Sequence, residues 1–393
     1  MGDEQNDGRR RTLYVLASGN FAQFGTRILI GALVPFILID FQTTKASIGL
    51  ALTGMWAVYA LFQFPSGVLA DQYGERQLLL LGLSGSAVGV VLVAVAPSLP
   101  LFALLLLVLG AGTGLFYPPA SVLVTRLYDD HGGAIGTLAA FGTFAGLVYP
   151  AVGGLAAEHV GWRVVLALTA VFTGVVILTT ARVVPRVPPV NDGTALRDSI
   201  DLGEYRALLA RPALLYTIAM AVVFIFTFQG LSSFYPTFLF EYHGIDRGVA
   251  GAMLGGVLGV SSVAQPVAGR LSDSFSRDGM LVVSIVLLVT SLTVLLTVQS
   301  LAGALVGSVV LGTGLSFPGP LQARFMDLLG ESERGYGFGL VRTVYMFLGA
   351  SGSVAVGTVA DASGWIPAYS LVAGLLGVCL LLILGNRLFA LGL

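Results

Sequence analysis

The chain has 393 residues, of which 56% are apolar and only 10% are charged, and its mean hydropathy is +0.89. Soluble domains carry about 25% charged residues, so this composition excludes a soluble globular protein and predicts an all-α integral membrane protein. One cysteine, Cys379, and three scattered histidines give no disulfide framework and no metal cluster. We therefore expect no cofactor, and the bilayer as the main partner with no nucleic acid.

Apolar runs long enough to cross a bilayer occur twelve times along the chain. A spanning helix needs about 20 mostly apolar residues. The predicted spans are 12–39, 47–70, 77–96, 99–124, 134–157, 163–183, 213–240, 248–271, 279–298, 301–323, 336–360 and 366–386.

A polar, proline-containing segment separates the sixth span from the seventh. It predicts three parts: an N-terminal six-helix half at 1–183, a cytoplasmic linker at 184–212 and a C-terminal six-helix half at 213–393.

The basic residues are distributed unevenly between the two sides of the predicted membrane. Fifteen of the 20 Lys and Arg lie on the side of the N-terminus, three lie on the other side, and two lie within spans. Because loops rich in Lys and Arg stay in the cytoplasm, both termini are predicted to be cytoplasmic, in a multi-pass protein of the plasma membrane.

The two halves resemble each other at a shift of about 200 residues. Gly112-Thr-Gly-Leu115 matches Gly312-Thr-Gly-Leu315, Asp71 matches Asp273, and Gly161-Trp162 matches Gly364-Trp365. Each half has an even number of spans, so the repeats share one topology. This predicts two bundles related by a pseudo-two-fold axis along the membrane normal.

The loop after the second span carries the sequence Gly67-Val-Leu-Ala-Asp71-Gln-Tyr-Gly74-Glu-Arg76. Gly67 and Gly74 allow close approach and a tight turn, and Asp71 can accept hydrogen bonds from an arginine or a helix N-terminus.

A less complete copy of this loop sequence, with Asp273 and Arg277, follows the eighth span. The loop resembles the signature of the major facilitator superfamily, G-x-L-x-D-x-x-G-x-R. The resemblance implies twelve helices in two bundles, transport by alternating access, and a latch at this loop that closes the cytoplasmic side. A plain turn with Asp71 as a helix cap is the alternative.

The fifth span ends in Tyr149-Pro150-Ala-Val-Gly153-Gly154. This sequence is similar to part of the family's antiporter motif, with Tyr149 in place of the first glycine. A simple packing helix explains these residues equally well.

Two arginines remain inside predicted spans, where a charge costs about 2.5–3.5 kcal/mol on insertion scales. Asn20, Gln23 and Arg27 share one face of the first span, and Arg342 and Tyr345 lie in the eleventh. No acidic residue or histidine lies at mid-membrane depth. A cavity lined by both arginines attracts anions, whereas the alternatives are a structural Arg27 and an Arg342 that extends to the cytoplasmic interface.

Other polar and aromatic residues lie at a depth that suits the same cavity, although each could equally serve packing. The predicted additional substrate contacts are Tyr59, Gln63, Tyr117, Tyr149, Gln229 and Gln265.

No phosphate-binding loop or dinucleotide fingerprint is present in the sequence, which predicts a protein that is not an enzyme and does not use ATP. We expect a monomeric secondary active transporter of a small organic or inorganic anion, with H+ or Na+ as candidate coupling ions. The substrate itself, Asp40 or Glu158 could carry the proton. The alternatives are a proton-coupled exporter of drugs or lipophilic compounds, and a sensor or scaffold that does not transport.

Overall fold

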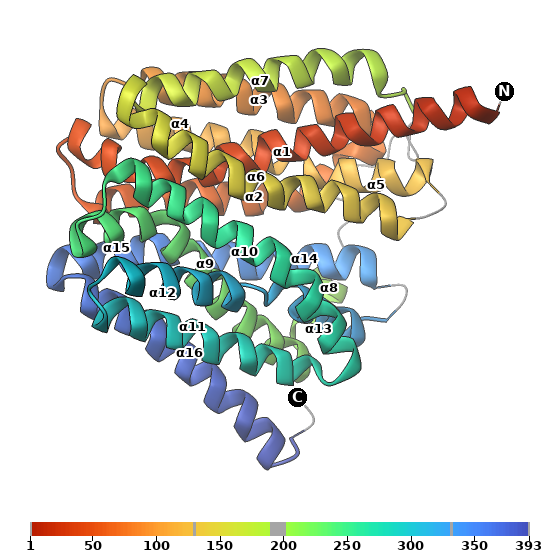
Figure 1. Cartoon of the computed structure of the whole chain (residues 1–393). Coiled ribbons are helices and arrows are strands. Elements are labelled where there is room, and N and C mark those ends of the chain that lie inside the picture. The colour runs from red at the N-terminus through yellow and green to blue at the C-terminus, as the bar shows by residue number, and fades with distance from the viewer. Residues whose placement is uncertain (1, 129–130, 189–201, 331–332, 392–393) are drawn as a thin grey trace.

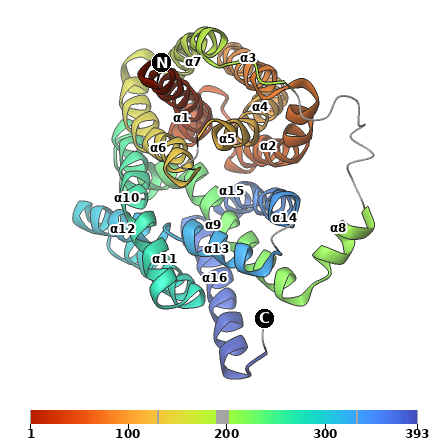
Figure 2. The same cartoon turned by 90° about the vertical axis from the view of Figure 1, so that its right-hand side faces the viewer.

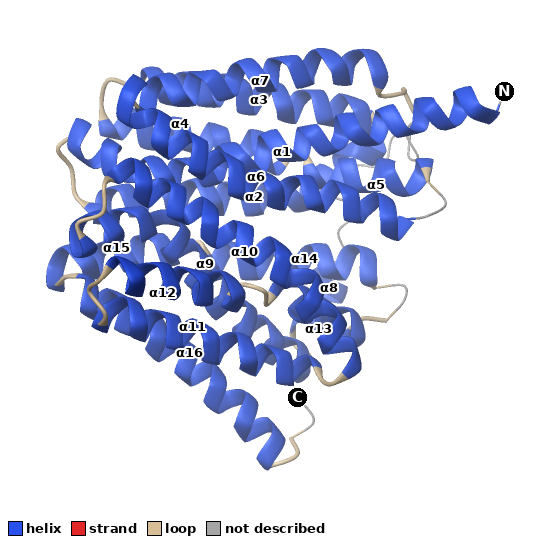
Figure 3. Ribbon diagram, viewed as in Figure 1, coloured by secondary structure: helices blue, strands red, loops and turns tan. Residues whose placement is uncertain are grey.

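The computed structural model describes residues 2–128, 131–188, 202–330 and 333–391. Within them the chain forms sixteen helices and no strand (Figure 3). Long apolar segments become helical in a bilayer because a helix satisfies every backbone hydrogen bond within itself.

The N-terminal half forms one layer of helices, at the top of Figure 1. Its helices are α1 (Gly2–Asp40), α2 (Lys45–Tyr73), α3 (Glu75–Val95), α4 (Leu99–Gly114), α5 (Tyr117–Leu127), α6 (His131–Val160) and α7 (Trp162–Val183).

The C-terminal half forms the second layer, below it in the same view. The linker helix α8 (Leu202–Leu209) precedes it, and its own helices are α9 (Pro212–His243), α10 (Arg247–Ser274), α11 (Arg277–Thr297), α12 (Leu301–Gly314), α13 (Pro318–Leu328), α14 (Arg334–Gly349), α15 (Gly352–Ser363) and α16 (Trp365–Leu388).

Twelve stretches of the described residues are long and apolar enough to span a membrane, as the sequence predicts. Three spans are broken where the sequence predicts continuous helices: α4 gives way to α5, α12 to α13, and α14 to α15. The first two breaks precede prolines, Pro118 and Pro318, at the first turn of the next segment. A proline there lacks the N–H that would continue the preceding helix.

The linker holds a short helix, α8, that the hydrophobic pattern does not predict, and its residues 189–201 lie outside the described part.

The two halves meet along helix pairs that the internal repeat makes equivalent. Helix α6 packs against α10, and α2 packs against α14 and α15, while α1 and α9 meet between them (Figure 2). We call the end that carries the α2–α3 and α10–α11 turns the terminal face, since both chain termini belong to it. The opposite end, where α1 turns into α2 and α9 into α10, is the distal face.

Backbone contacts between the halves are closest toward the distal face. A Cβ atom built on Gly49 would lie 2.5 Å from the Ser353 carbonyl oxygen, and one on Gly154 would lie 2.9 Å from the Gly251 Cα. Toward the terminal face, the nearest atom to a Cβ at Gly339 is in Phe64, at 3.9 Å, and a Cβ at Gly67 would meet nothing within 4 Å. The conformation is therefore sealed at the distal face and packed more loosely at the terminal face.

The role of Gly67 in the gating loop stays a prediction, and in this conformation a Cβ at Gly67 would meet nothing within 4 Å.

Candidate functional site

Arg27 lies in the interior of α1 and is only 5% exposed. Its Nε donates a hydrogen bond to the Gln23 carbonyl oxygen at 3.2 Å. Its guanidinium carbon lies 3.7 Å from the ring centroid of Tyr59 and 5.0 Å from that of Trp56, both on α2. Aromatic faces attract cations, so these rings hold the guanidinium in place while leaving its charge unneutralised.

Arg342 approaches the same place from the other half. It is carried by α14, and its guanidinium carbon lies 5.4 Å from the ring centroid of Tyr117. Tyr59 interacts with both Arg27 and Arg342, and Tyr345 also faces Arg342. The structure therefore directs Arg342 toward interior tyrosines rather than toward the terminal interface.

The two arginines have no acidic partner. Within the described ranges, no carboxylate lies at ion-pair distance from either guanidinium, and the two cations are close enough to repel each other. Buried charges are normally paired, because an unpaired charge loses its hydration without compensation. This site therefore carries an excess of positive charge that a bound anion would neutralise.

Several buried polar atoms around the arginines also lack a hydrogen-bond partner in the structure. They include both side-chain amide atoms of Gln23 and the Nε of Arg342, and elsewhere, on α9, the Oε1 of Gln229 is unpaired as well. Gln23 is 2% exposed and lies one helical turn from Arg27. Leaving such a group unsatisfied costs about 1–3 kcal/mol, so these atoms are suited to contact a bound polar ligand or water.

The remaining predicted site residues are held by other contacts. Asn20 donates to the Leu138 carbonyl oxygen at 2.8 Å, and the Nε2 of Gln63 lies 3.6 Å from the Sδ of Met346 across the two halves. Tyr149 packs edge-on to Phe21, with ring centroids 5.2 Å apart. The structure thus gathers Gln23, Arg27, Tyr59, Tyr117, Arg342 and Tyr345, and it engages Asn20 and Tyr149 in helix packing.

Gln265 lies instead in a separate pocket of about 220 Å³ between the halves. Phe24 and Thr143 line it from the N-terminal half, and Phe228 and Ser261 from the C-terminal half. The Phe24 ring centroid also lies 5.7 Å from the Arg27 guanidinium carbon, so this mostly apolar pocket and the arginine site share Phe24.

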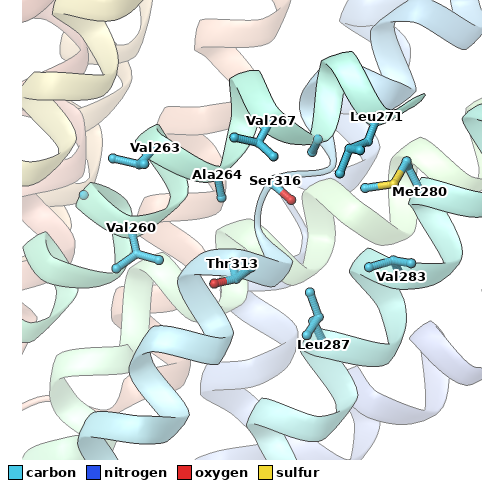
Figure 4. A pocket seen from close by; sticks show the side chains of 12 residues that line it. Val260, Val263, Ala264, Val267, Leu271, Met280, Val283, Leu287, Thr313 and Ser316 are labelled. Carbon is cyan, nitrogen blue, oxygen red and sulfur yellow. The ribbon is translucent and has the colours of Figure 1, made fainter. Parts of the chain in front are cut away.

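A larger groove of about 620 Å³ lies on the C-terminal half alone, between α10, α11 and the α12–α13 break (Figure 4). Its lining is almost wholly apolar, and Val263 and Val267 are exposed at its edge. We assign it to the lipid-facing surface, since none of its lining residues is charged.

The predicted gating loop is built around a tight turn, as expected. Gly74 adopts a positive φ of 87° between α2 and α3. Arg126, on α5, lies 3.5 Å from Asp71 and 2.5 Å from Glu75, whose side chain is 1% exposed. Arg76 donates to the Ala181 carbonyl oxygen on α7. These contacts join four spans at the terminal face of the N-terminal half.

The C-terminal half repeats this arrangement. Arg277 pairs with Asp273 and, at 3.1 Å, with Asp327, while Arg324 pairs with Asp278. Glu75 and Arg324 are buried ion-pair members that the sequence pattern does not single out. The two halves are similar here only in outline, because each carries an acid in the first turn of its third span and an arginine near the end of its fourth.

Comparison with known proteins finds sequence relatives among bacterial transporters. The chain is 28% identical over 241 residues to multidrug resistance protein MdtG of Salmonella schwarzengrund, which covers 60% of this chain and 58% of that protein. It is 26% identical over 157 residues to a probable hexose phosphate transport protein of Chlamydia trachomatis, which covers 39% of this chain and 34% of that protein. The similarity therefore spans about a third to three fifths of these relatives.

Solved transporter structures share the fold over nearly the whole chain. A bacterial homologue of the human lysosomal transporter Spinster, in an inward-facing, unoccupied conformation, superposes with a TM-score of 0.82 at 17% identity, covering 97% of each chain. A peptide transporter in complex with sulfate gives a TM-score of 0.80 at 11% identity, covering 96% of this chain and 94% of that one.

The sequence profile of one family matches the chain over residues 15–262 and 225–389. This match covers nearly all of the twelve spans and agrees with the two-bundle architecture. The chain belongs to the Major Facilitator Superfamily of membrane transporters.

Proposed function

We propose that this transporter carries a small organic or inorganic anion by alternating access, with Arg27 and Arg342 as the central anion clamp. The observation that supports the proposal most strongly is the pair of uncompensated guanidiniums, one from each half, that both interact with Tyr59. An arginine can bind a carboxylate or phosphate through two parallel hydrogen bonds.

The arrangement also suggests how substrate binding and conformation are linked. Without an anion, the two guanidiniums repel each other across the interface of the halves. A bound anion attracts both, so it stabilises a conformation in which the halves close around the centre. A ligand shifts a conformational equilibrium in this way through its different affinities for the two states.

The orientation in the membrane is part of the proposal. We propose a monomer in the plasma membrane with the terminal face in the cytoplasm, because most basic residues lie on that side. The conformation described here is then sealed on the outside.

Thermal unfolding of the purified protein in the presence of defined anions tests the clamp. We expect inorganic phosphate, glucose 6-phosphate or benzoate to raise the Tm of the wild type and to lose this effect in Arg27→Ala and Arg342→Ala. Arg387→Ala, at an exposed position, is the matched control and should respond like the wild type. Equal stabilisation of the Arg27→Ala variant, or stabilisation by ethidium and by none of the anions, would contradict the proposal.

Export of lipophilic compounds is the second candidate function. The mostly apolar pocket between Phe24 and Phe228 and the similarity to a multidrug resistance protein favour it. Ethidium accumulation in a drug-sensitised host distinguishes the two functions, because an anion carrier should leave it unchanged.

A further inference from the structure

Two carboxylates at the distal face reach across the interface of the halves and bind backbone N–H groups. Asp361 of α15 accepts a hydrogen bond from the N–H of Ala46 at 2.7 Å, and Glu158 of α6 accepts one from the N–H of Gly248 at 2.9 Å. Ala46 and Gly248 are the second residues of α2 and α10. Each carboxylate therefore occupies the N-terminal turn of a helix in the other half.

These two contacts are equivalent under the internal repeat. Glu158 aligns with Asp361, and Ala46 aligns with Gly248, at a shift of about 200 residues. The distal seal thus consists of two reciprocal clamps, one carboxylate from each half.

The only lysine of the chain strengthens one of the clamps. The Nζ of Lys45 lies 3.5 Å from Asp361 and 3.0 Å from Glu241, and its side chain is 17% exposed. Trp365 also donates to Glu241 through its indole N–H at 3.0 Å. Lys45 belongs to the N-terminal half and both acids to the C-terminal half, so this ion triad exists only while the distal face is closed.

The other clamp has a different charge environment. Among the described residues, Glu158 has no ion-pair partner. The titratable and charged groups at the same ends of the helices are His159 on α6, Arg247 and the preceding Asp246 at the start of α10, Asp40 at the end of α1 and Arg163 at the start of α7. Arg163 forms an ion pair with Asp40 at 2.8 Å, and the Arg247 guanidinium carbon lies 5.0 Å from the Phe36 ring centroid. The Gly248 N–H and the helix N-terminus are thus the main attraction for the Glu158 carboxylate.

Both clamps depend on the ionised form of the acid. A carboxylate binds a backbone N–H, a helix N-terminus and an ammonium group more strongly than a neutral carboxylic acid does. Proton binding to Glu158 or Asp361 therefore weakens the distal seal, and sealing favours release of the proton.

We propose that Glu158 and Asp361 are proton-binding sites that link protonation from the distal side to opening of the distal face. Each takes up a proton on a carboxylate oxygen as its contact with Gly248 or Ala46 breaks, and it returns the proton to water as the contact re-forms. This inference rests on the alternating access of the proposed function and is independent of the anion.

The single lysine provides a direct test that needs no substrate. Acetylation of Lys45 by a water-soluble amine reagent is followed by mass spectrometry in the full-length protein. We expect Glu158→Gln to raise the labelling rate at pH 8 at least fivefold, although Glu158 does not contact Lys45. Asp246→Asn, which removes an exposed carboxylate at the same end, is the matched control and should label at the wild-type rate.

A pH series tests the protonation itself. The rate for the wild type, divided by that for the Glu158→Gln/Asp361→Asn double variant, should stay below about 0.2 from pH 8 to pH 5.5 and rise toward 1 as the pH falls below about 4, where carboxylates take up protons. Because both proteins carry Lys45, the ratio cancels the pH dependence of the amine.

A labelling-rate ratio that does not change with pH would overturn the proposal. So would a Glu158→Gln variant that elutes as a folded protein and labels at the wild-type rate. Failure of the anion clamp alone would leave the ratio dependent on pH, so the two failures can be distinguished.

Discussion

At the scale of single residues, the molecule keeps groups at its centre that lower its stability. Arg27 and Gln23 are buried with an unpaired charge and an unpaired amide, respectively. A residue selected for folding alone would be apolar here, because removing an unsatisfied polar group from a core is neutral or stabilising. We therefore propose that these groups bind a ligand and do not serve packing alone.

Gln23→Leu separates the two roles. We expect the free energy of unfolding of this variant to exceed that of the wild type by about 1–3 kcal/mol, because the substitution removes two unsatisfied buried atoms at similar side-chain volume. We also expect its anion transport to fall at least fivefold. Thermal unfolding and uptake are measured on the same preparation, and a variant that is less stable but fully active would refute a ligand-binding role for Gln23.

The sequence predicts part of this site for a physical reason. Charges are so rare in spans that Arg27 and Arg342 are conspicuous, and the helical period places Gln23 beside Arg27. The contact of Tyr59 with both arginines depends on how α1, α2 and α14 cross, which no local pattern encodes. The Glu158 and Asp361 clamps involve backbone N–H groups, which carry no side-chain signal, although the repeat aligns the two acids.

At the scale of helices, hydrophobic runs predict the number of spans. The positions of proline and glycine determine where spans break and which helices pack closely, and hydropathy does not reveal either. The breaks before Pro118 and Pro318 lie within apolar segments, so average hydropathy cannot locate them. Close helix pairs such as α6 with α10 depend on glycines whose partners lie far away in the sequence. Gly251, for example, packs against Gly154.

Gly251→Val tests the importance of this helix pair for the distal seal. A Cβ at Gly251 would lie 2.9 Å from the Gly154 Cα, so a larger side chain must push α6 and α10 apart. We expect at least a tenfold loss of transport and faster acetylation of Lys45.

Gly256→Val on the same helix is the matched control, because a Cβ at Gly256 meets nothing within 4 Å. Equal activity of the Gly251 and Gly256 variants would show that close packing at the distal face is not required.

At the scale of the whole molecule, related contacts occur in pairs because the six-span unit is repeated within the chain. The arginine–carboxylate pairs at the terminal face and the carboxylate clamps at the distal face each appear once per half. The central site departs from this symmetry, since Arg27 lies in the first span of one half and Arg342 in the fifth span of the other. An asymmetric centre within a symmetric frame is suited to bind an asymmetric substrate while the two halves move about it.

Uptake of labelled anions into proteoliposomes tests the central claim most directly. Labelled phosphate, glucose 6-phosphate and benzoate are offered to the wild type, Arg27→Ala, Arg27→Lys and Arg387→Ala. We predict that the wild type and Arg387→Ala take up at least one of these anions, that Arg27→Ala loses at least 90% of that uptake, and that Arg27→Lys retains an intermediate rate. Undiminished uptake by Arg27→Ala, or ethidium transport without transport of any of the three anions, would contradict the account.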